Sequence, residues 1–391
     1  MRQLFKIILG TVLGLFVFFG FAFVIVAGIG AAASQGGGPK VKANSILRIS
    51  MEQPIADKGM DNPFGKFGGE PTRLPLEKVV GALKAAAKDE KIKGILIDAR
   101  MLNMGMAATE ELRNNLLEFK KSKKKIFAYM DAGTEGAYYL ASVADRIFLT
   151  PEGMIELNGL STTSAFLKGM FAKLEMEPQV FRVGEFKSAV EPFILDKMSD
   201  ANRLQTTSFL NSINDLMLTN MAASRKIELS RMRQIQDSML VRNADDALRL
   251  GIIDQKAYFD EMEDELRKIA GTDADKKINY ISLGKYVGDQ KDDEEKTGDK
   301  IALVLAEGEI SSGSSDDAIG ADDLTKEIRK ARMDKDVKAI VLRVNSPGGD
   351  ALASDVIWRE VELTKKTKPV IVSMGNLAAS GGYYIRSEER V

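Results

Sequence analysis

The chain has 391 residues, of which 45% are apolar and 28% charged, the balance of an ordinary globular protein. Its formal net charge of −1 gives no reason to expect nucleic-acid binding. The sequence contains neither cysteine nor histidine. Disulfides, thiolate nucleophiles, imidazole zinc sites and a Ser-His-Asp triad are therefore excluded. Acid–base chemistry near neutral pH must then use a carboxylate, a tyrosine or a lysine with a lowered pKa.

An uncharged apolar run extends from Ile7 to Ala33. It exceeds the roughly 20 residues with which a helix spans a bilayer, and it is longer than the apolar core of most cleaved signal peptides. Two basic residues precede it, which favours an internal N-terminus. We therefore predict a transmembrane anchor and tether over residues 1–40, with the glycines of 36–39 as the flexible part. Cleavage after Ala31–Ala33 remains the alternative.

The charged stretch 289–300 is typical of a solvated linker. It predicts two domains, residues 41–288 and 301–391; the alternative is a loop inside one domain. The segments on either side resemble each other at an offset of 245 residues. Lys93–Ile97 matches Lys338–Leu342, and the pair Tyr138-Tyr139 matches Tyr383-Tyr384.

Both segments contain an apolar strand, an amphipathic helix and a second apolar strand. The two helices are predicted over Glu110–Lys121 and Ser354–Lys365. Strand, helix, strand in this order is the rhythm of a parallel sheet, so we predict an α/β protein built from tandem repeats.

The two repeats differ where chemistry would take place. The second has Asn-Ser-Pro-Gly348-Gly349 after its first strand and Ser380-Gly381-Gly before its tyrosine pair, where the first has Glu135. Glycines at a strand end let backbone N–H groups approach a ligand, as an oxyanion hole requires, although the same residues also suit a tight turn. Ser380, at a strand-to-helix junction, is a candidate nucleophile; the alternative is an N-cap serine.

A serine nucleophile in this chain needs a base other than histidine, and lysine is the leading candidate. Such a lysine should have apolar neighbours, because burial lowers the pKa of its ammonium group. Lys187 satisfies this in Val-Gly-Glu185-Phe-Lys187-Ser-Ala-Val-Glu191. The alternative is a surface lysine, or an ion pair with Glu185 or Glu191. Ser122 and Lys125 match a Ser-x-x-Lys pattern but lie in a lysine-rich turn, so this match is set aside.

Together, the anchor, the repeat and the motifs around Lys187, Gly348 and Ser380 resemble the long two-repeat form of bacterial signal peptide peptidase A, also called protease IV. The resemblance implies tandem Clp-protease/crotonase-like repeats, each a spiral of ββα units. It implies Ser380 as nucleophile and Lys187 as general base. It also implies that Gly348, Gly349 and Gly381 bind the oxyanion or the substrate, and it implies neither a metal nor a cofactor.

The resemblance further implies a serine endopeptidase that degrades cleaved signal peptides in the bacterial inner membrane. Its catalytic part would face the periplasm, and it would form a homotetramer without a nucleic-acid partner. After Ile385 the sequence departs from the family pattern, ending in the charged residues 386–391. We therefore expect an incomplete second repeat. This keeps two alternatives open: an inactive fragment that acts only in binding or assembly, and an acyl-CoA enzyme on the crotonase fold.

Overall fold

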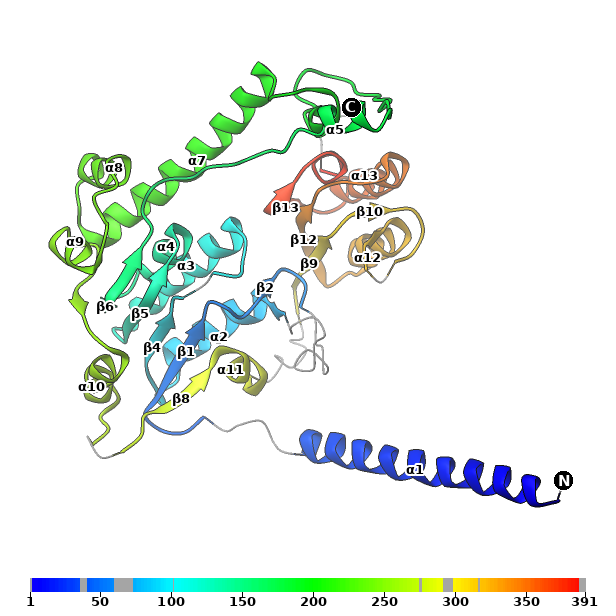
Figure 1. Ribbon diagram of the computed structural model, residues 1–391, viewed down its shortest axis with the longest axis horizontal. Helices are drawn as coiled ribbons and strands as arrows, with labels where there is room; N and C mark the ends of the chain where they lie inside the picture. Colours follow the sequence, from blue (N-terminus) through cyan, green and yellow to red (C-terminus); the bar gives the residue numbers. More distant parts are fainter. Residues whose placement is uncertain are drawn as a thin grey trace.

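The computed structural model describes residues 2–35, 41–59, 73–100, 102–273, 276–290, 298–315 and 317–386. Three predicted features lie wholly or mostly outside these residues: the tether at 36–39, the linker at 289–300 and the chain end at 387–391. The first element, helix α1 (Arg2–Gln35), extends away from the rest of the protein (Figure 1).

Helix α1 contains the whole apolar run of the sequence. Its described apolar side chains are exposed, among them Phe16, Phe18 and Phe19. Among the described residues, no helix meets both the length and the apolarity that crossing a membrane requires.

A six-stranded, all-parallel sheet forms the centre of the first repeat, in the order β7-β6-β5-β4-β1-β8. Its central strands are covered on both faces, which explains why β4 reads as a continuous apolar run: Ile95, Leu96 and Ile97 are all fully buried. The strands are β1 (Ser45–Ser50), β4 (Ile92–Asp98), β5 (Lys125–Gly133), β6 (Arg146–Ile155), β7 (Gln255–Lys256) and β8 (Asn279–Ser282).

Helices cover this sheet on both sides. On one face α2 (Leu76–Lys88), α3 (Met106–Lys120), α4 (Glu135–Ala141) and α11 (Leu283–Asp289) contribute to the larger apolar core. On the other face α10 (Phe259–Ala270) packs on β1, β4 and β5 around a second core. The first repeat is therefore a three-layer α/β unit with its own interior.

A smaller parallel sheet, β13-β12-β9, forms the second repeat. Its strands are β9 (Lys300–Glu307), β12 (Val337–Ser346) and β13 (Val370–Ala378), and its helices are α12 (Ala321–Met333), α13 (Ala351–Lys365) and α14 (Gly381–Tyr384). Two short parallel pairs accompany the sheets: β2 (Ile55–Ala56) with β3 (Leu74–Pro75), and β10 (Ile310–Ser311) with β11 (Ile319–Gly320).

The structure extends the internal repeat beyond the register found in the sequence. Helices α2 and α12 start 245 residues apart and have the same length, and so do α3 and α13. Helices α3 and α13 begin earlier than predicted, at Met106 instead of Glu110 and at Ala351 instead of Ser354. In α13 the reason is a side-chain cap, because Asp350 accepts a hydrogen bond (2.7 Å) from the N–H of Ala353.

Between β6 and the buried start of the next core segment at Met217, the chain forms a long excursion. We call residues 158–216 the arm. It holds α5 (Lys168–Lys173), α6 (Glu191–Ile194) and most of α7 (Asp200–Arg225), which runs along the upper edge of the molecule in Figure 1. The chain then returns through α8 (Leu229–Asp237) and α9 (Ala244–Arg249) to the first sheet.

The two repeats contact each other through polar groups. The Arg343 guanidinium lies 3.0 Å from the Asp57 carboxylate and 3.2 Å from that of Glu111. The side-chain oxygen of Asn376 on β13 accepts hydrogen bonds from the N–H groups of Ala107 (3.0 Å) and Ala108 (3.2 Å). A residue of the second repeat thus caps the first turn of α3 in the first repeat.

Candidate functional site

Ser380 lies in the turn between β13 and α14, with φ 50° and ψ −121°. This backbone conformation is uncommon for any residue with a side chain, so the surrounding hydrogen bonds must hold it. The N–H of Ala379 donates to the Ser346 carbonyl (3.0 Å), which ties the turn to the end of β12. Ser380 precedes α14 without a side-chain capping hydrogen bond, and its side chain is exposed. The hydroxyl is therefore not used as a helix cap.

The glycine loop after β12 packs directly against this turn. Gly348 has φ +96°, and a Cβ placed on it would lie 2.8 Å from Ser380 Cβ and 2.6 Å from the Gly381 nitrogen. No side chain fits there, so glycine is required both for its conformation and for the close approach. Gly349, with φ +155°, is packed in the same way on the backbone of Ile310. The structure thus brings Gly348, Ser380 and Gly381 together.

The N–H groups at this junction differ in their availability. The N–H of Gly348 donates to Ser346 Oγ (3.1 Å) and is already engaged. The N–H groups of Gly349 and Gly381 donate to no acceptor among the described residues. Two of the three predicted oxyanion donors thus have an N–H without an acceptor among the described residues, while Gly348 lets the two turns meet.

Lys187 lies on the arm, at an exposed position between α5 and α6. Its carbonyl accepts a hydrogen bond (3.1 Å) from Arg182 Nη1. Its ammonium group makes no hydrogen bond or ion pair with the described residues, so neither Glu185 nor Glu191 is its partner. No hydrogen bond joins Lys187 to Ser380, and their pairing as a dyad stays a prediction.

Glu135 occupies the position in the first repeat that Ser380 has in the second. Its carboxylate is buried and accepts hydrogen bonds from the N–H groups of Asn158 (3.2 Å) and Gly159 (2.8 Å), and from the Gln236 side chain. Burial raises the pKa of Glu135, and these hydrogen bonds partly oppose the effect. The carboxylate holds the first residues of the arm rather than facing a cleft, so this copy of the site is structural.

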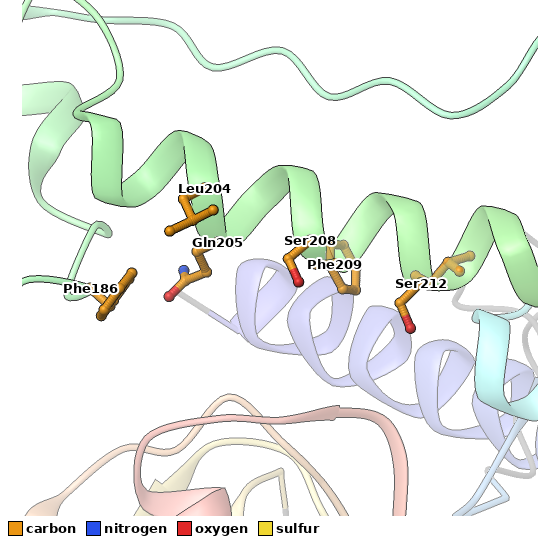
Figure 2. Close-up of a pocket in the computed structure, with 7 residues that line it drawn as sticks. Phe186, Leu204, Gln205, Ser208, Phe209 and Ser212 are labelled. Carbon is orange, nitrogen blue, oxygen red and sulfur yellow. The ribbon is translucent and has the colours of Figure 1, made fainter.

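An open pocket lies on the arm beside Lys187. Figure 2 shows Phe186, the neighbour of Lys187, across a gap from side chains that project from α7. The pocket measures about 610 Å³, and a smaller one of about 320 Å³ adjoins it, with Phe209 lining both. The larger pocket is lined by Phe186, Leu204, Gln205, Ser208, Phe209, Ser212 and Ile213.

Comparison with known proteins shows which peptidases the chain resembles. Residues 118–273 match the family model "Peptidase family S49". The chain is 33% identical to Protease 4 of Haemophilus influenzae over 390 residues, which covers 95% of this chain and 63% of that protein. It is 35% identical to Protease 4 of Salmonella typhi, covering 93% of this chain and 62% of the relative. The chain is thus similar to peptidase family S49 and, over most of its own length, to the proteins named Protease 4.

A chloroplast relative extends the comparison beyond bacteria. The chain is 33% identical to "Serine protease SPPA, chloroplastic" of Arabidopsis thaliana over 356 residues, or 88% of this chain and 51% of the relative. The chain thus spans between half and two thirds of the length of these relatives. The family-matched residues include Lys187 and the whole arm, while Ser380 lies beyond them.

From the sequence, Glu191 is expected only as a possible ion-pair partner of Lys187. In the structure it is fully buried and bonded to the start of α7 instead. The signal that could have revealed this is a carboxylate in the apolar stretch Ala189-Val-Glu191-Pro-Phe193, since a charged group among apolar residues is retained only where it is paired.

Proposed function

We propose that this protein is a membrane-anchored serine endopeptidase with Ser380 as nucleophile and Lys187 as general base. The observation that carries the proposal is the Ser380 turn. There a serine with a positive φ, whose hydroxyl does not cap the following helix, adjoins a glycine loop, and the N–H groups of Gly349 and Gly381 have no acceptor among the described residues. Similarity to a peptidase family supports the reaction class. We further propose that each repeat has the Clp-protease/crotonase fold, with which the parallel sheets are consistent.

In the proposed reaction, Ser380 Oγ attacks the scissile carbonyl carbon while its proton passes to Lys187 Nζ. The carbonyl oxygen becomes an oxyanion, to which the N–H groups of Gly349 and Gly381 donate. Lys187 then gives the proton to the leaving amine, and the C–N bond breaks to leave an acyl-enzyme. Water hydrolyses this ester with Lys187 again as base. Lys187 must be neutral at the start, so the site has to disfavour its charged form.

For the substrate we propose cleaved signal peptides and similar apolar segments at the bacterial inner membrane. The apolar side chains that line the larger pocket beside Lys187 support this, since Phe186, Leu204 and Phe209 would contact apolar side chains of the substrate. In the sequence, the uncharged run from Ile7 to Ala33 and the basic residues Arg2 and Lys6 before it support a single-pass anchor, which leaves the remainder on the periplasmic side. A homotetramer is proposed from the family resemblance alone.

The dyad is tested by labelling the purified chain with a fluorophosphonate. We expect labelling in the native chain, none in Ser380→Ala, and only a slow residual rate of labelling in Lys187→Arg, because arginine stays protonated. The absence of cysteine allows a sharper test. Lys187→Cys should be inactive and should recover on alkylation with bromoethylamine, which installs thialysine. Since thialysine is less basic, the acidic limb of the pH–rate profile should move to lower pH.

A second candidate is a binding or assembly role without catalysis. The exposed ammonium of Lys187, with no hydrogen bond to Ser380, is the observation that favours it. The same experiment separates the two, because a chain that acts only in binding shows no Ser380-dependent labelling. Parallel assays with a peptide and a thioester substrate distinguish the peptidase from an acyl-CoA enzyme.

A further inference from the structure

The arm is organised around a carboxylate instead of an apolar core. Glu191 is the single buried residue among residues 158–216, all of which the structure describes. Large apolar side chains of the same segment are exposed, including Phe181 and Val183, at 95% and 94%. A buried carboxylate is tolerated only where it is paired and hydrogen-bonded, so this position has a specific task.

Both oxygens of Glu191 are bound by the beginning of α7. Oε1 accepts a hydrogen bond from Ser199 Oγ (2.6 Å), while Oε2 accepts from Asn202 Nδ2 (2.8 Å) and from the N–H of Ser199 (3.2 Å). Desolvation by burial opposes ionisation, but these hydrogen bonds and the charge of Arg182 outweigh it, so the pKa of Glu191 lies below its usual range. The ionised carboxylate thus ties the loop before α6 to the long helix.

The same carboxylate fixes the backbone around Lys187. Arg182 Nη1 lies 3.6 Å from Glu191 Oε1 and donates a hydrogen bond (3.1 Å) to the Lys187 carbonyl. On the other side, the N–H of Glu191 donates to the Ser188 carbonyl (3.0 Å). The backbone at Lys187 and Ser188 is therefore tied on one side to Arg182, which pairs with the Glu191 carboxylate, and on the other to the main chain of Glu191, while the Lys187 side chain makes no hydrogen bond or ion pair with the described residues.

We propose that Glu191 and Arg182 are positioning residues that set where Lys187 presents its amine to the reacting serine. The inference rests on the proposed function, in which Lys187 is the base. Proton transfer tolerates little displacement, and a misplacement of about 1 Å can reduce a rate roughly 100-fold. The exposed neighbours of Lys187 cannot fix its position by packing, so the Arg182–Glu191 pair is the element that does.

The test compares Arg182→Gln and Glu191→Gln with the native chain on a fluorogenic apolar peptide. We expect kcat to fall about 10- to 100-fold in both variants with KM nearly unchanged. Arg182→Lys, which keeps the charge but loses the planar fork, should be intermediate. Asp196→Asn is the matched control: it removes the Lys168–Asp196 pair (2.9 Å) from the same arm, and it should keep the native kcat. Because Arg182 lies at the surface of the loop, its variants remain informative if Glu191→Gln does not fold.

A background variant separates a positioning role from a general structural one. In Lys187→Arg, adding Arg182→Gln should lower the residual rate of Ser380 labelling no further, since the pair acts through Lys187. A further fall in the labelling rate of the double variant would overturn the positioning role. A native kcat in Arg182→Gln, in an assay where Lys187→Arg is inactive, would also overturn it. Native activity in Lys187→Arg itself would instead overturn the proposed function.

Discussion

At the scale of residues, the candidate site depends on backbone conformations that few residues adopt. Ser380 has a positive φ with a side chain present, and Gly348 has a positive φ with no room for one. These two residues come from turns at the ends of neighbouring parallel strands, which is where such sheets place their functional groups.

Gly348→Ala should inactivate the site without unfolding the first repeat. The added Cβ would overlap the Gly381 nitrogen and Ser380 Cβ, so the turn must shift, and we expect labelling of Ser380 to fall by roughly 100-fold. Gly313→Ala is the matched control, because Gly313 also has a positive φ (+75°) but open space around it. Equal losses in the two variants would mean that backbone strain, not displacement of Ser380, is responsible.

Glu135 should give the protein a small, measurable pH dependence of stability. Its folded pKa is raised above the ordinary 4.5, so the folded state binds the proton more tightly than the unfolded chain. Its contribution is then fully present below about pH 4.5 and is lost as pH rises through the folded pKa. Compared with Glu135→Gln in urea unfolding, the native chain should lose relative stability from pH 4.5 upwards. A difference that is constant with pH would contradict this assignment.

Glu191 should give a pH dependence of stability that is opposite in sign to that of Glu135. Its folded pKa is lowered, so its contribution is present above the unfolded pKa and disappears as pH falls through the folded value. The protection of the arm that depends on Glu191, measured as the difference in pepsin cleavage rate between the native chain and Glu191→Gln, should therefore disappear as pH falls below about 4.5. A difference that does not change with pH would show that the ionised carboxylate does not hold the arm.

At the scale of elements, the structure shows a helix capped from the other repeat. Gly105 precedes α3 and offers no side-chain cap, and the Asn376 side chain takes that role from β13. Asn376 lies on the same strand that leads into the Ser380 turn. The strand that leads to the candidate nucleophile therefore also makes this contact with the first repeat.

Asn376→Ala should weaken this contact by about 1 kcal/mol, the typical value of a lost N-terminal cap. Asn376→Asp is the control, because a carboxylate still accepts both hydrogen bonds and interacts favourably with the positive end of the helix. Urea unfolding of the two variants checks the difference. Equal stability of the alanine variant and the native chain would show that water replaces the cap at no cost.

The extent to which the sequence predicted these features follows from the range of the interactions. Strands such as Ile92–Asp98 and the register of the tyrosine pairs could be predicted because they depend on local periodicity. The start of α3 could not, because its cap at Asn376 is 269 residues away in the chain. Lys187 stood out only through its motif, and the role of Glu191 required seeing which side chains meet in space.

At the scale of the whole molecule, a buried ion pair joins the repeats. The Asp57 and Arg343 side chains are 6% and 12% exposed, and Asp57 Oδ2 has no hydrogen-bond partner among the described residues. Their attraction therefore acts in a weakly screened environment, and losing one partner leaves the other charge buried.

Arg343→Met should destabilise the protein by about 3–5 kcal/mol, and Asp57→Asn together with Arg343→Met should recover much of that loss. The single tryptophan, Trp358 on α13, provides a fluorescence signal from the second repeat alone, whereas circular dichroism reports both. We expect the fluorescence transition in urea to precede the dichroism transition in Arg343→Met. Coincident transitions in that variant would show that other contacts couple the repeats.

The order of the strands along the chain has a consequence during synthesis. Every strand of the larger sheet lies between Ser45 and Ser282, and Lys187 is presented within that same stretch. At ordinary rates of translation, the ribosome needs roughly 5–20 s more to reach Ser380, and N-terminal domains fold first. The first repeat and its arm can thus be complete on the ribosome before the candidate nucleophile has been synthesised. Under the proposed function, a nascent chain in that state holds the general base without its serine and cannot cleave itself or its neighbours.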